Sequence, residues 1–544
     1  MARQRERLAD PAPSETLARS HALCAGTGRS LPPPWKDVPS WAALGRHPPK
    51  PMTYGVEKSD SRIVPRKPAN KTGLPVAESV EGSSGVERNA ELQSTKRTQS
   101  REAVSQAQAR IREAVRRNPK EKLTALLHHV SVDVLRAAFY GLKRSAAPGI
   151  DGQTWDRYAE NLETNLAGLH ARVHTGAYRA LPVRRRFIPK ADGRQRPLGI
   201  TAIEDKIVQG AVVAILTPIY EAEFLGFSYG FRPGRSQHDA LDALAYGIKA
   251  KKICWILDSD IRAFFDRLDQ QWLVQFVEHR IGDRRIVRLI QKWLRAGVME
   301  EDRWIETGEG TPQGATISPM LANVYLHYVY DLWVQQWRRR HATGDMIVVR
   351  YADDAIVGFQ HQQDAQRFLA DLQNRLREFA LETHPEKTRL IEFGRTAERD
   401  RARRGEGRPD TFDFLGLTHI CGTKKDGKTF QLWRRTQRKR LKAKLKDVKE
   451  GLGRRVHLPI AEQGRWLGGV VRGYFAYHAV PTNFKALCDF RKYVGWHWLR
   501  AIRRRSQRWR MKWEHMRSQI DRYLPQPKIS HPWPEQRFRV THSR

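Results

Sequence analysis

The sequence predicts an α+β protein that ends in a helical, strongly basic region. Short apolar runs on either side of polar turns predict β-hairpins, as in LPVRRRFIPKADGRQRPLGI (181–200) and IVVRYADDAIVGF (347–359). Between them, longer segments carry apolar residues three and four positions apart, the spacing of amphipathic helices. After Arg434 the helical spacing continues, but Lys and Arg dominate the polar positions.

The charge of the chain narrows the class of partner. Its 544 residues have a formal net charge of +38, which favours a polyanionic partner. Nucleic acid is the first candidate and a membrane surface the second. The sequence contains no long uninterrupted apolar segment, so no transmembrane helix is predicted. The N-terminus lacks the apolar run of a secretory signal. Four widely spaced cysteines argue against a zinc site or disulfide framework and indicate a reducing, intracellular compartment: Cys24, Cys254, Cys421 and Cys488.

Residues 1–88 are predicted to be a low-complexity, poorly folded extension. RSLPPPWKDVPSW and GRHPPKP are rich in Pro, and ESVEGSSGVERN is polar and rich in Gly and Ser. Met52 lies inside this region and could be the true start of translation instead of Met1. That is a hypothesis, and an N-terminal peptide that begins near Met1 would refute it.

The remaining elements follow in order along the chain. Helices are expected over 100–117 and 121–144, with a loop over 145–155. The hairpin over 181–200 turns at Asp192-Gly193, and a helix covers 204–224. A strand leads into a helix over 251–268, and a helix ends at 327–340 before the 347–359 hairpin. A further hairpin covers 409–435, and no internal repeat is evident.

The 347–359 hairpin places two acidic residues, Asp353 and Asp354, at its tip. Asp is common in turns because its side chain can bond its own backbone. The alternative is that the two carboxylates hold metal ions, which needs a third carboxylate. In WILDSDIRAFFD, Asp258 and Asp260 lie two apart and so share one face of a strand. Two-metal phosphoryl transfer uses such clustered carboxylates, and Mg²⁺ prefers oxygen ligands.

These residues resemble the palm of reverse transcriptases: an aspartate, an aromatic five residues later, then a Tyr-Ala-Asp-Asp hairpin. Asp260 with Phe265 fits that spacing, whereas Asp258 has Ala263 at the same offset. The resemblance implies a right-hand polymerase in which Asp260, Asp353 and Asp354 bind two Mg²⁺ ions. It makes Phe265 the candidate steric gate that excludes a 2′-hydroxyl. The alternative for Phe265 is a core aromatic on an amphipathic helix.

Further motifs appear in the order that the family uses. GEGTPQGATISPMLANVYL resembles the Pro-Gln-Gly motif of the nucleotide pocket, in which Gly310 and Gly314 allow close backbone approach and Gln313 hydrogen-bonds. Lys190 and Arg196 are the matches for cations on the incoming triphosphate, or else belong to a solvated basic hairpin. In THPEKTRLIEFG, Lys387 matches a lysine that protonates the leaving group. FDFLGLTH resembles the hairpin that grips the primer end.

The resemblance narrows to group II intron-encoded reverse transcriptases. SAAPGIDGQTW, RPLGITAIEDKIVQ and SYGFRPGRSQHDAL look like elements of that family. RWLGGVVRGYFAYHAVPTNFKALCDFRKYVGWHWLRAIRRRSQ resembles its maturase-specific thumb. Matching stretches run from about residue 100 to about 538. The implied domains are fingers over 89–245, a palm with an antiparallel sheet over 246–425, and an all-helical thumb/maturase domain over 426–544.

The basic C-terminal region also has its own physical pattern. Residues 434–455 carry eleven Lys or Arg against two acids, and four apolar residues at helical spacing predict one packed face: Leu441, Leu445, Val448 and Leu452. Between Arg491 and Arg517, ten cations stand against one acid. Arg503, Arg504 and Arg505 are candidate phosphate contacts. Interleaved aromatics are candidates for stacking on unpaired RNA bases: Tyr493, Trp496, Trp498, Trp509 and Trp513. The alternative is a solvated charged face.

The expected function is RNA-directed DNA synthesis from dNTPs on an RNA template with a DNA primer. The resemblance adds binding of a group II intron RNA, assistance to its splicing and mobility, and target DNA as a partner. It implies a bacterial cytoplasmic protein, associated with the nucleoid when on DNA, and leaves a homodimer open. The alternatives are another prokaryotic reverse transcriptase (retron, diversity-generating or defence type), an RNA-binding splicing factor without polymerase activity, or a metal-dependent nuclease. The tail after Arg505 lacks the paired cysteines and His-Asn-His spacing of an HNH endonuclease, so we expect no cleavage of the second DNA strand.

Overall fold

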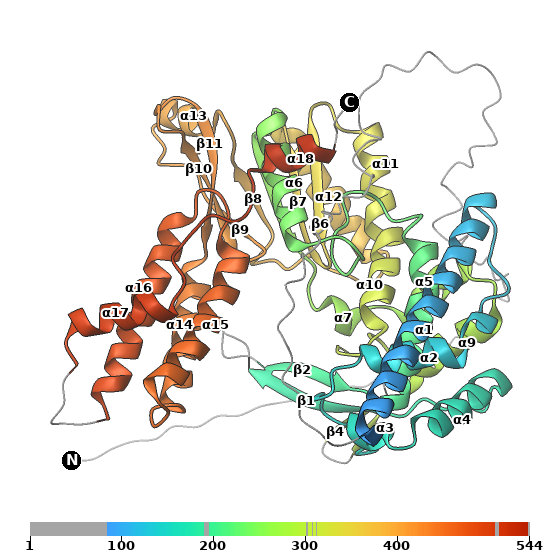
Figure 1. Cartoon of the computed structure of the whole chain (residues 1–544). Helices are drawn as coiled ribbons and strands as arrows, with labels where there is room; N and C mark the ends of the chain where they lie inside the picture. The colour runs from blue at the N-terminus through green and yellow to red at the C-terminus, as the bar shows by residue number, and fades with distance from the viewer. Residues whose placement is uncertain are drawn as a thin grey trace, which may run out of the picture. The chain divides into compact units, whose positions relative to one another are not determined.

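The computed structural model describes residues 84–189, 195–300, 303–306, 308–311, 313–505 and 511–541 (Figure 1). Side chains are described from Thr98 onward, except at Pro189 and over 538–541. All of these residues belong to one unit, Gly55–Arg544. The predicted N-terminal extension therefore lies outside the described residues, apart from the start of the first helix at Ser84.

The first part of this unit is mainly helical. Three helices pack against one another: α1 (Ser84–Arg117), α2 (Val132–Gly141) and α5 (Ile203–Tyr220). The sequence predicted one continuous helix over 121–144, and this prediction is wrong. A short 3₁₀ turn (Leu127–His129) ends before Ser131, whose hydroxyl accepts a hydrogen bond from Val134 N at 3.4 Å and so starts α2. The two other helices here are α3 (Trp155–Ala159) and α4 (Leu162–Thr175).

The predicted hairpin over 181–200 is present as two antiparallel strands, β1 (Val183–Pro189) and β2 (Gln195–Ile200). Two short strands from much later in the chain extend it, β4 (Val298–Glu300) and β5 (Arg303–Ile305). The strand order is β2-β1-β4-β5, with β4 parallel to β1. The predicted turn at Asp192-Gly193 lies outside the described residues.

The second sheet contains the acidic hairpin. Its strands are β3 (Trp255–Asp260), β6 (Met346–Tyr351), β7 (Asp354–Phe359) and β8 (Arg389–Glu392), in the order β6-β7-β3-β8. Every neighbouring pair is antiparallel. Both the 347–359 hairpin and the strand at 255–260 were predicted from apolar alternation. The sheet sets them side by side, with β7 between β6 and β3.

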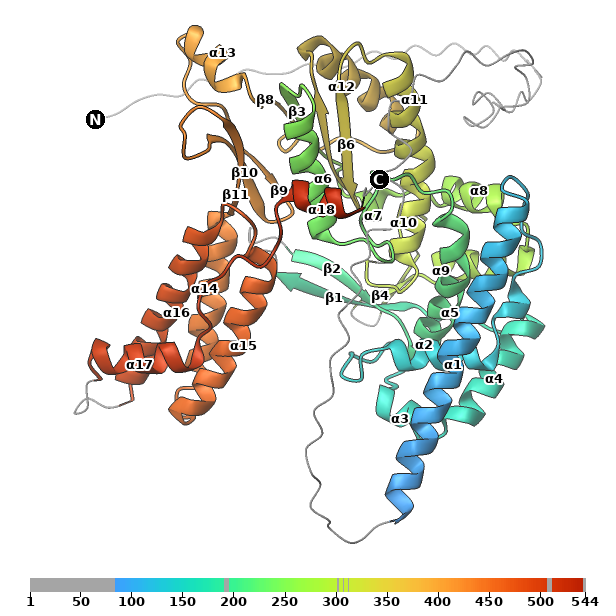
Figure 2. The same cartoon turned by 45° about the horizontal axis from the view of Figure 1, so that its top comes forward.

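Helices pack on both sides of this sheet (Figure 2). Helix α6 (Gln237–Ala250) contributes Leu241 and Leu244 to a core with Ile256 and Ile356 of the strands. Helix α12 (Gln362–Arg377) packs against β3 and β7. The remaining helices of this region are α7 (Phe264–Arg267), α8 (Gln270–Arg280), α9 (Arg284–Arg295), α10 (Ser318–Leu326), α11 (Leu332–Arg340) and α13 (Ala397–Arg403), with a π-helical turn at His327–Asp331.

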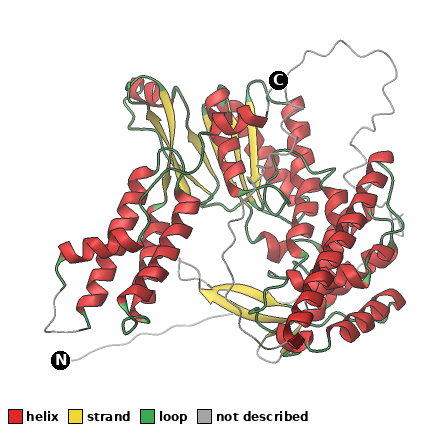
Figure 3. Cartoon of the chain, viewed as in Figure 1, coloured by secondary structure: helices red, strands yellow, loops and turns green. Residues whose placement is uncertain are grey.

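A three-stranded sheet leads into the C-terminal helices. The predicted hairpin forms β10 (Leu417–Thr423) and β11 (Phe430–Thr436), and a third strand, β9 (Phe412–Phe414), pairs with β10. The helices that follow, as the secondary-structure colouring of Figure 3 shows, are α14 (Arg438–Gly453), α15 (Ile460–His478), α16 (Phe484–Arg503), α17 (Trp513–Tyr523) and α18 (Pro534–Thr541).

The apolar face predicted for residues 434–455 is confirmed. Val448 and Leu452 are buried in the core of the C-terminal helices, and Leu441 and Leu445 pack against that core. Helix α18 instead lies beside α6, where Arg537 pairs with Asp239 at 3.0 Å (Figures 1 and 2). Among the described helices, none combines the length and the apolar character needed to cross a bilayer.

Candidate active site

The acidic turn is a tight two-residue connection. Tyr351 and Asp354 are paired across the hairpin, so Ala352 and Asp353 alone make the turn. Ala352 has φ +57°, a left-handed conformation that residues other than Gly rarely adopt. Such a turn holds Asp353 at the tip and leaves Asp354 as the first residue of β7.

Strand register brings the third carboxylate to this turn. Asp260, the last residue of β3, is the direct partner of Asp354 on β7, and Asp258 is the partner of Ile356. Directly opposite residues of antiparallel strands have Cβ atoms about 4.5–5.5 Å apart. Three aspartates predicted from separate segments, Asp260, Asp353 and Asp354, therefore lie together.

The carboxylates influence one another strongly. Burial raises the pKa of Asp353, and Asp260 adds to the rise while Arg196 and Lys387 oppose it. Asp354 is exposed, yet the atoms packed around it raise its pKa to about 7 by desolvation, with repulsion from Asp353 and Asp260 as the next causes. Like charges that are held close together in this way are relieved by a bound cation.

Lys387 lies directly at this cluster. Its ammonium donates a hydrogen bond to Asp260 Oδ2. The loop that carries it is held to the end of β3, because His384 N donates to Asp260 O at 2.7 Å. On the other side, Arg389 of β8 pairs with Asp258 at 3.6 Å. The cations thus separate the two aspartates of β3 into different ion pairs.

The donor set fits a hard divalent cation. In the described part of the chain no group of three or more His, Cys, Asp or Glu side chains is arranged so that it could hold a metal ion by itself. Mg²⁺ commonly takes one or two protein carboxylates and completes its shell with water and substrate phosphates. The oxygen ligands of Asp260, Asp353 and Asp354, at a water-accessible hairpin tip, suit that mode of binding.

A pocket of about 210 Å³ lies next to the helix that follows β3. Phe265, Asp266 and Gln313 line it together with Pro197 and Gly199 of β2. Phe265 is half-buried, whereas its neighbour Phe264 is in the core. The structure therefore brings Phe265, Gln313 and the β1–β2 hairpin to one cavity.

The two predicted glycines make the close contacts expected of them. Gly310 has φ +79°, and a Cβ there would lie 2.8 Å from the carbonyl oxygens of Phe265 and Asp266. Gly314 has φ +115°, and a Cβ there would lie 2.5 Å from Gly199 O. Gly199 N also donates to Gln313 O at 2.6 Å. These contacts join the Pro-Gln-Gly loop to the Phe265–Asp266 backbone on one side and to β2 on the other.

Of the two residues predicted to contact the triphosphate, the structure describes Arg196 but not Lys190. Arg196 is exposed on β2 and close enough to lower the pKa of Asp353. Lys190 lies outside the described residues. Arg196 therefore shares the electrostatic field of the carboxylate cluster.

In the C-terminal helices, the prediction that Trp498 is available for stacking on RNA bases is wrong. Trp498 is 0% exposed in the helical core, and its indole N–H donates to Gln463 Oε1 at 2.9 Å. Tyr493, Trp496 and Trp513 are exposed by 49%, 44% and 38%, and Trp509 lies outside the described residues. Helical periodicity explains the difference, because Trp498 shares its face with Val494 and Ile502, which are also buried.

The predicted arginine cluster lies at the end of α16. All three residues, Arg503, Arg504 and Arg505, are exposed. Arg503 Nε donates to Met511 O at 3.0 Å, and Arg505 donates to Leu458 O. Two of the three guanidinium groups are therefore held by backbone carbonyls while remaining open to solvent.

Sequence reasoning missed two residues at the site. Gln313 Nε2 lies 3.4 Å from a carboxylate oxygen of Asp266, which was not a candidate. Arg350, the residue before Tyr351, is fully buried directly behind the turn. A signal for Arg350 was present, because it is the one charged residue in the apolar strand segment 346–351.

Comparison with known proteins agrees with this arrangement. Residues 188–419 match the reverse transcriptase (RNA-dependent DNA polymerase) family. Group II intron-encoded protein LtrA of Lactococcus lactis is 35% identical over 236 residues, 42% of this chain and 38% of LtrA. Protein YkfC of Escherichia coli K12 is 36% identical over 188 residues, 34% of this chain and 49% of YkfC. Nuclear intron maturase 3 of Arabidopsis thaliana is 29% identical over 173 residues, 28% of this chain and 24% of that protein.

The fold, the carboxylate cluster and the matched region define the class: the chain carries a reverse transcriptase domain. The relatives that it matches include a group II intron-encoded protein and an intron maturase, in agreement with the resemblance found in the motifs. The matched region covers less than half of the length of each of these relatives. Reverse transcriptase domains use divalent metal ions, and nucleic acid is their substrate.

Proposed function

We propose that the chain is an RNA-directed DNA polymerase that adds deoxynucleotides to the 3′-hydroxyl of a DNA primer on an RNA template. The observation that carries this proposal is the register of β3 and β7, in which Asp260 is paired with Asp354 beside the Ala352–Asp353 turn. A structural Asp-Asp turn would need no third carboxylate opposite it. The repulsion among the three groups further supports a site for cations.

In this proposal Asp260, Asp353 and Asp354 hold two Mg²⁺ ions. Bound Mg²⁺ neutralises charge on the triphosphate and orients the reacting oxygens. The aspartates would supply the oxygen ligands, and Arg196 of β2 would contact the phosphates, with Lys190 as the second proposed cation. Lys387, which bonds Asp260, would donate a proton to the leaving pyrophosphate.

The pocket would take the incoming nucleotide. Phe265 forms its wall on the side of the sugar, Gln313 donates hydrogen bonds, and Gly314 lets the loop approach β2. In this arrangement β1 and β2 belong to the fingers, the four-stranded sheet is the palm, and the C-terminal helices are the thumb. The proposed boundaries are those of the predicted domains, 89–245, 246–425 and 426–544, but the last domain is not all-helical as predicted, because β11 (Phe430–Thr436) lies within it and pairs with β10.

The second part of the proposal is maturase activity. The C-terminal helices would bind intron RNA through Arg503, Arg504 and Arg505, with exposed Tyr493 and Trp496 available for stacking. The protein would stabilise the folded RNA, while the RNA performs the splicing chemistry. Target DNA, dNTPs and a second copy of the chain would be further partners, met in the bacterial cytoplasm.

A primer-extension assay tests the polymerase. The purified chain is incubated with Mg²⁺, dNTPs and a DNA primer annealed to RNA, and with a matched DNA template in a parallel reaction. We expect extension on RNA that requires the divalent ion. No extension with Mg²⁺ or Mn²⁺, together with tight binding of a group II intron RNA, would favour a splicing factor without polymerase activity.

A second assay separates a group II maturase from another prokaryotic reverse transcriptase. Splicing of the intron that surrounds the gene is followed at low Mg²⁺, with and without the protein. We expect protein-dependent splicing of that intron and none of an unrelated group II intron. Extension without any effect on splicing would favour a retron-like or defence enzyme.

A further inference from the structure

Arg350 occupies an unusual position in the palm-like sheet. It is the residue before Tyr351 on β6, and only 1% of it is exposed. A buried guanidinium is tolerated only where its charge is paired and its N–H groups are bonded. The groups around Arg350 must therefore satisfy its charge and its N–H donors.

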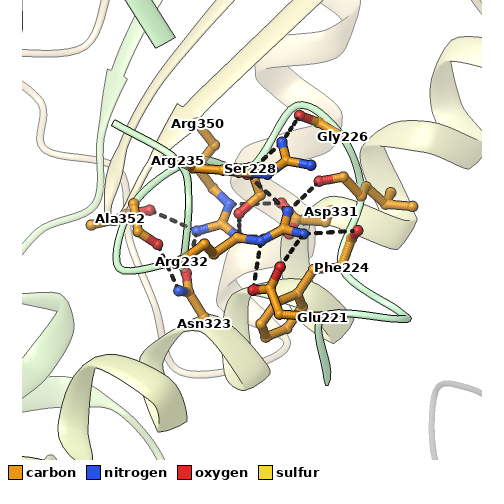
Figure 4. Close-up of polar contacts among 12 residues, drawn as sticks. Glu221, Phe224, Gly226, Ser228, Arg232, Arg235, Asn323, Asp331, Arg350 and Ala352 are labelled. Atoms are coloured by element: carbon orange, nitrogen blue, oxygen red, sulfur yellow. Dashed lines mark hydrogen bonds and ion pairs between the residues drawn. The ribbon is translucent and has the colours of Figure 1, made fainter. Parts of the chain in front are cut away.

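All five N–H donors of this guanidinium have a partner (Figure 4). Two bond the carboxylate of Asp331 in forked geometry at 2.7 and 2.6 Å. The others donate to Asn323 Oδ1 at 3.1 Å and Ser228 Oγ at 2.7 Å. The fifth donates to the carbonyl of Ala352 at 2.9 Å.

The bond to Ala352 reaches the acidic turn itself. Ala352 is the left-handed residue of that turn and immediately precedes Asp353. A non-Gly residue keeps such a conformation only where its surroundings determine it. Arg350 supplies one such constraint. Gly230 supplies another, since a Cβ there would lie 2.3 Å from Ala352 N.

The partners of Arg350 come from separate elements. Asp331 is fully buried at the end of the π-helical turn that follows α10, and Asn323 belongs to α10. Asn323 Nδ2 also donates to Gly230 O at 2.7 Å. One guanidinium thus connects the turn to the helix behind it and to the segment that contains Ser228.

That segment, Ser228–Ser236, carries the SYGFRPGRS motif, which the proposed polymerase reaction does not use. The backbone of this segment and of the preceding Phe227 bonds the Arg350 backbone: Tyr229 N donates to Arg350 O at 2.8 Å, and Arg350 N donates to Phe227 O at 2.9 Å. Its two arginines also bond the protein. Arg232 bonds Glu221 twice at 3.0 Å, and Arg235 donates to Gly226 O (Figure 4).

The basic character of this motif therefore does not make it a nucleic-acid contact. The Arg232 side chain is 2% exposed and donates to the carbonyl oxygens of Leu225 and Ser228 at 2.7 and 2.9 Å. These bonds stiffen the segment from within. A stiff segment against β6 can fix the position of the turn.

We propose that Arg350 is a positioning residue that fixes the Ala352–Asp353 turn against the Ser228–Ser236 segment and α10, and so sets the geometry with which Asp353 and Asp354 bind divalent cations. This inference rests on the proposed function of the aspartates. Arg350 itself touches neither cation nor nucleotide. Its loss acts through the backbone of Ala352.

Two variants separate positioning from simple stability. Arg350→Lys keeps a positive charge for Asp331 but has three donors instead of five. The double variant Arg350→Met with Asp331→Leu removes both charges together, a replacement that is often neutral for folding. In both variants, the carbonyl oxygen of Ala352 loses the hydrogen bond that the Arg350 guanidinium donates to it.

The matched control is a second buried ion pair, Arg434 with Asp242, at 2.5 Å and with both side chains 3% exposed. It joins β11 to α6 and not the turn. Arg434→Met with Asp242→Leu removes both charges of a buried pair at another place, and because Asp242 also pairs with Arg537 at 3.0 Å, this control is at least as severe. A general loss of stability would affect both double variants alike.

The first readout is direct binding of Mn²⁺ to the full chain on a primer–template duplex, followed by the loss of the free-ion signal in electron paramagnetic resonance. Residues that orient metal ligands typically change metal affinity about 10- to 100-fold. We expect a weakening of that size in both Arg350 variants and none in the control. The second readout is primer extension, where we expect kcat to fall on the order of 10²-fold, as for a small misplacement of reacting groups.

Binding of the RNA–DNA duplex and thermal unfolding complete the experiment. We expect duplex affinity to stay within about twofold, because phosphate contacts lie elsewhere. If either folded Arg350 variant binds Mn²⁺ and extends primers as the parent does, Arg350 has no positioning role. If the parent itself binds no Mn²⁺ at Asp353 and Asp354, as judged by Asp353→Asn, the proposed function has failed instead.

Discussion

Gly310→Ala is expected to damage the pocket proposed for the incoming nucleotide, and the distances around Gly310 give the size of the effect. The new Cβ would lie 2.8 Å from both Phe265 O and Asp266 O, closer than carbon atoms approach carbonyl oxygens in folded proteins. The loop cannot simply move away, because Gly310 N donates to Leu268 O at 2.7 Å and Thr311 N donates to Phe265 O at 2.8 Å. The methyl group must therefore displace the Phe265 backbone, the loop, or both.

Two costs combine in this variant. A left-handed backbone at φ +79° costs a residue with a Cβ about 1–2 kcal/mol. Forcing a methyl group into filled space costs about 1–3 kcal/mol more. The total of about 2–5 kcal/mol falls on the contact between the Pro-Gln-Gly loop and Phe265. If only about 2 kcal/mol of it reaches the nucleotide complex, kcat/KM falls about thirtyfold.

The assay is single-nucleotide incorporation with the dNTP titrated against a fixed RNA–DNA duplex. Gly308→Ala is the matched control, because it lies in the same loop, is not left-handed and would have nothing within 4 Å of its Cβ. We expect the control to behave as the parent. Values of kcat/KM for Gly310→Ala and Gly308→Ala that agree within about threefold would refute the reasoning, since the contact would then be irrelevant to the pocket.

Three further variants test the remaining site residues. Replacing both Asp353 and Asp354 with Ala should abolish cDNA synthesis but leave RNA affinity nearly intact, because RNA affinity comes mostly from phosphate contacts. Primer extension measures the synthesis and filter binding measures the affinity. If the double variant still extended a primer, the assignment of these aspartates to the site would be wrong. Phe265→Ala should raise rNTP relative to dNTP incorporation by opening space for a 2′-hydroxyl, and an unchanged ratio would make Phe265 a packing residue only. Changing all of 503–505 to Ala should lower the slope of log affinity for intron RNA against log salt by about one unit per lost phosphate contact, so an unchanged slope would exclude this cluster from the RNA interface.

Local pattern was sufficient for the elements of the site. The alternation of apolar residues defined β3, β6 and β7, because a strand with alternating faces needs only a period of two. The same alternation placed Asp258 and Asp260 on one face. The helical spacing of residues 441–452 predicted which side of α14 is buried. Motif spacing was also sufficient to recognise the reverse transcriptase family.

Where local pattern was ambiguous, the sequence prediction went wrong. Periodicity continued through 121–144, but Ser131 competes for the backbone N–H groups and starts a new helix there. Trp498 was grouped with exposed aromatics because cations surround it in sequence. On the helix it belongs to the buried face, since the face of a helical residue depends on neighbours three and four positions away.

Composition, motifs and periodicity by themselves predicted the class of protein, the three candidate aspartates and the segments that carry them. Only the tertiary structure decided that Asp260 is paired with Asp354, that the Pro-Gln-Gly loop touches both Phe265 and β2, and that Arg350 is buried behind the turn. The physical reason is range. A residue's own neighbours determine strand or helix, whereas register and burial depend on segments more than a hundred positions away, as between Arg350 and Ser228.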